Sequence, residues 1–238
     1  MALLRDVLQA SGGLDRWRKM RRYTLHLSIG GVLCRHKCSA ARLDELVVDG
    51  TVREQSLEII GFTAPDRRAL YRADWVALEG ADGRRLNERH ASPAEFRSRL
   101  NSSIWDELQL AHYCGYLIWN YVNVPFILSD PDFRADELEP MIEHGETWRR
   151  LRVEFPPRVV THAAEQVFSF DGDGHLRRLD YTADFQRSAP LTQLTSGHQR
   201  FAGILVPTLS RILCTAPVGV SAAKSPLVDI EIFDAVFE

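Results

Sequence analysis

The sequence predicts a mainly β protein with helices (α+β): an unclosed antiparallel β-barrel or curved sheet of about 11 strands, wrapped around a buried helix. Apolar and polar residues alternate along about a dozen short stretches, and tight-turn residues separate most of these stretches. One long, mostly apolar helix interrupts the series. We expect residues 1–238 to form a single domain, because no internal repeat or low-complexity segment divides them.

The first elements are a short helix that ends at Ser11-Gly12-Gly13 and a second helical turn or two over Leu14–Met20. A strand comes next, in which Tyr23, Leu25, Leu27 and Ile29 alternate with polar residues. This is the two-residue period of a half-buried strand. The same pattern predicts strands over Glu45–Asp49, Val52–Ile60, Arg68–Ala73, Val76–Glu79, Glu137–Glu143, Trp148–Phe155, Glu165–Phe170, Leu176–Phe185, Leu191–Phe201, Leu205–Cys214 and Val228–Phe237.

The predicted helix covers about residues 103–121. Ser103 and Asp106 have the spacing of a capping box, and Pro125 ends the helix or kinks the chain after it. The helix is apolar on nearly every side, which is typical of a buried or membrane-spanning helix. Its acidic and amide side chains make a membrane span too costly. We therefore expect it at the open mouth or on the concave side of the sheet.

Charge and composition exclude several classes of protein. The chain has 29 basic and 32 acidic side chains and a net charge of −3, which gives no long-range attraction to nucleic acid or to an anionic membrane. Basic residues over Arg16–Arg22 have acidic residues nearby, so they are interpreted as a solvated face. No nucleotide-binding or phosphate-binding motif is present, so no cofactor is expected. The sequence shows no export signal, which predicts a cytoplasmic protein with reduced cysteines.

A polar stripe on the predicted helix is the first candidate site. Gln109, His112, Tyr116 and Asn120 recur every three or four residues, and Asn123 continues the series, so they share one side of the helix. They can face a cavity and orient a ligand there, with His112 exchanging protons near neutral pH. Alternatively they bond to loop backbone and hold the helix in place, because buried polar groups are normally satisfied.

His162 is the second candidate, at the start of a predicted strand. A hairpin around Gly172-Asp173 brings the strand of Asp180 beside it, so His162 with an acidic neighbour can form a general base. A surface histidine is the simpler alternative. Cys34, His36 and Cys38 would share a strand face, but their spacing lacks the second ligand pair of a zinc site, so no metal is expected.

Several segments resemble proteins with the lipoprotein-carrier, LolA-like fold. The resemblance rests on Gly12–Lys19, Gly145–Val153, Asp173–Tyr181 and Phe201–Thr208, and on Trp105–Leu110 with Gly115-Tyr116 after it, which is similar to a group of soluble bacterial proteins of that type. It implies an unclosed barrel around a helix, with an apolar cavity that holds an acyl chain or a similar ligand. Carriers of this fold that serve lipoproteins carry a signal peptide, and because none is seen here, lipoprotein trafficking is not carried over.

A cavity of this kind suits two functions. The first is a cofactor-free cyclase or isomerase that binds an apolar or polycyclic molecule and moves protons through His112, His162 or Asp180. The second is a non-catalytic intracellular carrier or sensor of a hydrophobic metabolite. In both, the expected ligand-binding residues are Trp105, Gln109, Tyr113, Tyr116, Trp119, Asn120, Trp148 and Phe168. A structural module with a filled barrel interior is the third hypothesis. The sequence leaves the oligomeric state open.

Overall fold

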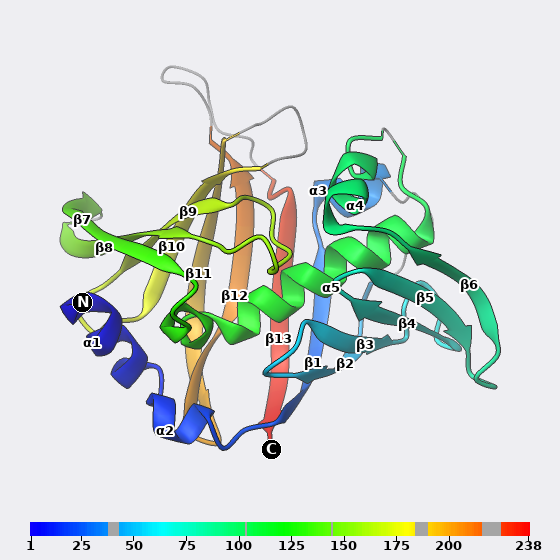
Figure 1. Ribbon diagram of the computed structural model, residues 1–238, viewed down its shortest axis with the longest axis horizontal. Helices are drawn as coiled ribbons and strands as arrows, with labels where there is room; N and C mark the ends of the chain where they lie inside the picture. Colours follow the sequence, from blue (N-terminus) through cyan, green and yellow to red (C-terminus); the bar gives the residue numbers. More distant parts are fainter. Residues whose placement is uncertain (38–42, 103, 144, 184–189, 216–224) are drawn as a thin grey trace.

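A single antiparallel sheet of 13 strands dominates the computed structural model, which describes residues 1–37, 43–102, 104–143, 145–183, 190–215 and 225–238. The first and last strands, β1 (Arg22–Gly30) and β13 (Val228–Phe237), pair in the middle of the sheet. From this pair, β2 to β6 extend to one edge and β12 to β7 extend to the other (Figure 1). The edge strands β6 and β7 do not pair, so the curved sheet is unclosed, as predicted.

The other strands follow the meander of the chain. They are β2 (Leu46–Thr51), β3 (Ser56–Ile60), β4 (Arg67–Arg72), β5 (Trp75–Gly80), β6 (Arg85–His90), β7 (Arg134–Glu143), β8 (Glu146–Glu154), β9 (Glu165–Phe170), β10 (Leu176–Thr182), β11 (Pro190–Phe201) and β12 (Ile204–Cys214). The helices are α1 (Ala2–Ala10), α2 (Leu14–Trp17), α3 (Val32–Lys37), α4 (Pro93–Arg99), α5 (Glu107–Asn123) and the 3-10 helix η1 (Phe126–Ser129).

The predicted alternation places the core on one face of the sheet. In β1 the side chains of Tyr23, Leu25, Leu27 and Ile29 are buried, whereas the residues between them are partly or fully exposed. The same two-residue period in β2 and β12 adds further apolar side chains to this face. The concave face is therefore the apolar interior of the half-barrel.

Helix α5 connects the two edges of the sheet, because it lies in the chain between β6 and β7 (Figure 1). It crosses the concave face and packs closely against β3, β4 and β5. Every residue from Leu108 to Asn123 is buried, which confirms the expectation of a buried helix. The close approach to β4 requires a glycine, because a Cβ atom on Gly115 would lie 2.2 Å from Cγ of Tyr71.

The helix begins later than predicted. Asp106, not Ser103, is its N-cap: the Asp106 carboxylate accepts a hydrogen bond from the backbone of Gln109, and the Gln109 side chain accepts one from the backbone of Asp106. This is a capping box displaced by three residues from the predicted one. Ser103 itself lies outside the described residues. The helix ends at Asn123, two residues before Pro125, as the proline predicts.

The sheet has more strands than the predicted 11 or so. β6, which none of the predicted stretches covers, is a sheet edge whose residues are almost all exposed. Since neither face of β6 is buried, its sequence Arg85–His90 carries no alternation from which a strand could be predicted. The stretch predicted over Val52–Ile60 is also shorter in the structure, where β3 begins at Ser56.

Two further expectations concern metals and membranes. Cys38 lies outside the described residues, as do the side chains of Cys34 and His36, so the structure describes nothing of that group. Among the described helices, we found none with the length and apolar character needed to cross a membrane.

Candidate functional site

His112 lies at the centre of a buried cluster of rings on α5. Its imidazole is fully buried, stacks on Phe96 with ring centroids 4.0 Å apart, and meets Tyr71 and Tyr116 edge-on at 5.6 Å and 5.5 Å. Neither imidazole nitrogen has a hydrogen-bond partner within the described part of the chain. Burial, with the positive charge of Arg97 adding to it, lowers the pKa of His112 to about 3. His112 is therefore neutral at pH 7.

Trp105 and Tyr113 extend this ring cluster toward the start of α5. The two rings lie 5.0 Å apart, and Tyr113 meets Tyr116 edge-on at 5.5 Å. Both side chains are buried, and the indole N–H of Trp105 donates to the carbonyl of Leu100. Aromatic rings therefore pack against one another along α5 from Trp105 to Tyr116.

Most of the predicted polar stripe bonds to backbone. The side-chain amide of Gln109 donates to the carbonyl of Arg99 over 2.6 Å, and that of Asn120 donates to the carbonyl of Val160 over 2.9 Å. The indole of Trp119 likewise donates to the carbonyl of Thr51 over 2.8 Å. These bonds match the alternative in which the stripe holds the helix in place.

His162 lines a small, partly open cavity at the other end of α5. Its ring stacks on Tyr181 at 4.6 Å and lies 5.4 Å from Tyr116, and burial lowers its pKa to about 4. The cavity has a volume of about 20 Å³, enough for about one water molecule. It is lined by Leu117, Asn120, Tyr121, Val124, Phe155, His162, Gln166, Phe168, Leu176, Leu179 and Gln193. The side chains around this cavity therefore leave no room there for an acyl or polycyclic group.

Asp180 and Trp148 lie away from this cavity. Asp180 accepts hydrogen bonds from Arg178 Nε (2.8 Å) and Thr192 Oγ1 (2.7 Å). Since its neighbour Tyr181 points inward onto His162, Asp180 points to the opposite face of β10. The structure therefore does not bring Asp180 and His162 together as a dyad. Trp148, on β8, donates its indole N–H to the carboxylate of Glu146 over 3.1 Å.

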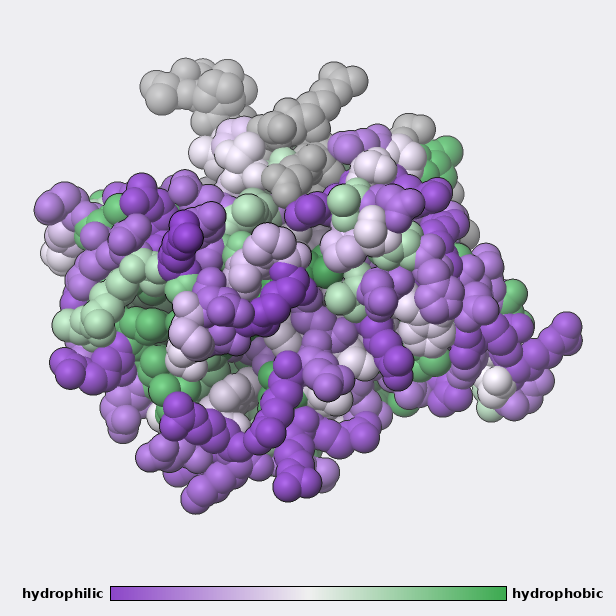
Figure 2. Space-filling view, in the orientation of Figure 1, coloured by the Kyte–Doolittle hydropathy of each residue, from purple (hydrophilic) through white to green (hydrophobic). Residues whose placement is uncertain are grey.

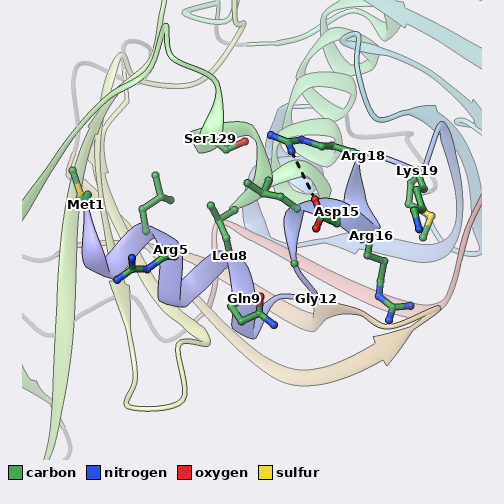
Figure 3. A pocket seen from close by; sticks show the side chains of 14 residues that line it. Met1, Arg5, Leu8, Gln9, Gly12, Asp15, Arg16, Arg18, Lys19 and Ser129 are labelled. Atoms are coloured by element: carbon green, nitrogen blue, oxygen red, sulfur yellow. Dashed lines mark ion pairs between the residues drawn. The ribbon is translucent and has the colours of Figure 1, made fainter.

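An open groove of about 870 Å³ lies between α1, α2 and η1 (Figure 3). Its size is within the range of small-molecule sites. Figure 3 shows Arg5 on α1, Arg16 and Lys19 in and just after α2, and Leu8 and Gly12 between them. The lining residues are Met1, Leu4, Arg5, Leu8, Gln9, Gly12, Gly13, Leu14, Asp15, Arg16, Arg18, Lys19, Met20 and Ser129.

Two glycines shape this groove at the turn between α1 and α2. Gly12 and Gly13 have φ of 123° and 83°, a backbone region that strongly favours glycine. A Cβ atom on Gly12 would also lie 2.5 Å from the carbonyl oxygen of Gly203. The turn thereby places α2 against the β11–β12 hairpin, where Arg16 Nη1 donates to the carbonyl of Ala202.

An aromatic stack joins α2 to η1 next to the groove. Trp17 of α2 stacks on Phe126 of η1, with ring centroids 4.3 Å apart and planes inclined by 7°. Ser129, at the end of η1, lines the groove, whereas Val124, just before η1, lines the cavity. In Figure 2, apolar residues gather over α1 on the left, with hydrophilic residues below them over α2.

The groove was not among the sites predicted from the sequence. The basic residues of Arg16–Arg22 were interpreted as a solvated face because acidic residues lie nearby in the chain. In the structure, Asp15 is the one acidic residue among those that line the groove. The available signal was the pair of glycines, because the turn that they form places Arg16, Arg18 and Lys19 across the groove from Arg5.

Comparison with known proteins identifies the fold. No family model matches the sequence, and no curated protein sequence is similar enough to serve as a relative. Similar solved structures include a DUF1329 family protein from Desulfovibrio piger, with a TM-score of 0.57 and 14% identity over 100% of this chain and 92% of that one. A LolA superfamily protein from Nitrosomonas europaea has a TM-score of 0.55 and 10% identity over 98% and 92%.

A third similar structure is an outer membrane lipoprotein-sorting protein domain from Vibrio parahaemolyticus, with a TM-score of 0.50 and 11% identity over 96% of this chain and 93% of that one. The likeness spans nearly the whole length of each of these chains, and it agrees with the unclosed 13-stranded sheet and its crossing helix. At these identities it shows the fold alone. This chain has a LolA-like fold.

Proposed function

We propose that this protein binds a hydrophobic small molecule and acts as a non-catalytic carrier or sensor of it. One observation carries the proposal: the groove between α1, α2 and η1 has the volume of a ligand site and is lined in part by apolar side chains. Its apolar members are Met1, Leu4, Leu8, Leu14 and Met20. The LolA-like fold supports the proposal by analogy, since one similar structure is named as a lipoprotein-sorting domain.

A ligand in the groove is held at the surface and not in the interior. The cavity beside His162 holds only about one water molecule, so an acyl or polycyclic group would enter it only if the side chains that line it moved apart. Helix α1 is tied to the sheet by an ion pair from Asp6 to Arg149 and by a hydrogen bond from Arg200 to the carbonyl of Ala10. Exposed ion pairs of this kind contribute about 1 kcal/mol or less.

A cofactor-free cyclase or isomerase is the weaker proposal. General bases work best with a pKa near the working pH, and the pKa values of His112 and His162 are about 3 and 4. Both imidazoles would therefore be weak bases at pH 7. One observation favours proton movement here. The ring of Tyr116 contacts both imidazoles, with its centroid 5.5 Å from that of His112 and 5.4 Å from that of His162.

Titration with a neutral, apolar fluorophore such as N-phenyl-1-naphthylamine tests ligand binding. We expect saturable binding with a Kd in the micromolar range, about −8 kcal/mol. Leu4→Arg, which puts a charge among the apolar groove residues, should abolish it. The matched control is Leu86→Arg on β6, where the leucine is already 48% exposed, and it should bind normally. Equal binding by both variants, or none by the wild type, would contradict the proposal.

A further inference from the structure

The groove between α1 and α2 carries a charge opposite to that of the whole protein. Four cationic side chains line it, those of Arg5, Arg16, Arg18 and Lys19, against the single carboxylate of Asp15. The complete chain has a net charge of −3. Because like charges repel, such a concentration of cations is costly unless solvent or an anion compensates it.

The protein itself neutralises little of this charge. Arg18 and Asp15 lie 3.8 Å apart and are 69% and 98% exposed, so their ion pair is weak. Arg16 uses one guanidinium N–H for the carbonyl of Ala202. Among the described residues, we find no ion pair of Arg5 or Lys19. The groove therefore keeps several cationic donors for an anion.

Apolar side chains lie directly beside these cations. Leu8 belongs to the same lining as Arg5 and Arg16 (Figure 3), and Leu14, the first residue of α2, lines the groove as well. An occupant that satisfies both sets of groups is an amphiphile, with an anionic head and an apolar chain. The surface is concave and has the volume of a ligand site, which favours one dissolved molecule over the broad surface of a bilayer.

We propose that the α1–α2 groove selects amphiphiles with an anionic head group, a carboxylate or a phosphate, over neutral ones of the same chain length. Arg5 lies at one end of the groove and Arg16 and Lys19 lie at the other (Figure 3), so the anionic head group is attracted at either end and the chain lies along Leu8 between them. This inference rests on the proposed function, because it names the class of ligand for the same groove.

A pair of probes that differ only in the head group tests it. Hexadecanoic acid and hexadecanol, each below its aggregation threshold, are used to displace N-phenyl-1-naphthylamine from the protein. We expect the wild type to prefer the acid by about tenfold or more, with a preference that falls as salt is added. Arg5→Gln/Lys19→Gln should lose the preference and keep the affinity for the alcohol.

Two controls show whether the charge of these side chains is responsible. Arg5→Lys/Lys19→Arg keeps the charges and should keep the preference. Arg134→Gln removes an arginine of β7 that is 84% exposed and does not line the groove, and this variant should bind both probes as the wild type does. Both pairs of substitutions are at exposed positions, and circular dichroism checks that the variants fold.

The outcomes separate the two proposals. If the alcohol binds but the acid is not preferred, or if Arg5→Gln/Lys19→Gln keeps the preference, this inference is overturned and the proposed function stands. If the wild type binds neither probe, the proposed function itself fails. If the protein binds anionic phosphatidylglycerol vesicles through Arg5 and Lys19 but neither dissolved amphiphile, the groove is a membrane-docking surface and the inference is wrong.

Discussion

Replacing His112 with phenylalanine should stabilise the protein, although the residue lies at the centre of the core. The ring is fully buried and has two nitrogens without partners in the described structure. Phenylalanine has a similar planar shape, so it can keep the stack on Phe96 and the edge contact with Tyr71. The substitution therefore removes buried polar atoms without leaving a cavity.

The magnitude follows from the cost of unsatisfied polar atoms. A buried donor or acceptor without a partner costs about 1–3 kcal/mol, so His112→Phe should raise the free energy of unfolding at pH 7 by about that amount. For a protein of this length, that corresponds to a rise in Tm of about 2–4 °C per kcal/mol.

A second effect depends on pH. Burial holds the pKa of folded His112 at about 3, whereas an unfolded histidine has a pKa of about 6.5. Between these values the unfolded state binds a proton that the folded state does not, so stability is full above pH 6.5 and is lost as the pH falls. From pH 6.5 to pH 5 the loss is about 2 kcal/mol for His112, and His162, with a pKa of about 4, adds a similar loss.

Urea denaturation at pH 7 and pH 5 measures both effects. The wild type should lose about 4 kcal/mol through these two histidines, and His112→Phe about 2 kcal/mol. His26→Gln, at an exposed position of β1, is the control and should follow the wild type. The reasoning is refuted if His112→Phe is less stable at pH 7, or if acidification destabilises it as much as the wild type. A stabilised variant that no longer binds the fluorophore would instead favour a ligand contact of His112.

Three other substitutions test the packing. Gly115→Ala should destabilise by about 1–3 kcal/mol in thermal denaturation, because its Cβ would overlap Tyr71, and an unchanged Tm would contradict the tight helix–sheet contact. Gln109→Ala removes half of the capping box and the bond to the Arg99 carbonyl, so we expect a loss of about 1–2 kcal/mol in urea denaturation; ligand affinity should not change unless Gln109 touches the ligand. Trp17→Ala should cost about 3 kcal/mol through the lost stack, and a fully stable variant would show that α2 is not anchored there.

Local periodicity predicted the fold well wherever one face of an element is buried. The alternation of apolar and polar residues from Tyr23 to Ile29 predicted β1, and the apolar surface of the central helix predicted its burial. The sequence did not predict β6, because a strand at a solvated sheet edge needs no alternation of apolar and polar residues. The start of α5 was misplaced because Ser103 and Asp106 have the same spacing as Asp106 and Gln109, and only the three-dimensional structure distinguishes the two capping boxes.

The candidate site was harder to predict than the fold. Helical spacing correctly placed Gln109, His112 and Asn120 along one helix, but it cannot say what lies opposite each of them. Gln109 and Asn120 face backbone carbonyls, whereas His112 faces aromatic rings. The groove cations come from two short helical segments, and their place on either side of one groove depends on the turn that Gly12 and Gly13 make with positive φ.

The topology explains why the groove and not α5 should respond to a ligand. α5 is buried from Leu108 to Asn123, packs against β3, β4 and β5, and is capped at its start. The opposite half of the concave face is covered by α1, α2 and η1, which have at most nine residues each. Short elements with few buried contacts open first, so amides of α1 and α2 should exchange hydrogen faster than those of α5. A ligand in the groove should slow hydrogen exchange at the amides of α1 and α2 and leave exchange in α5 unchanged. If exchange in α5 slows equally, the ligand lies in the interior instead.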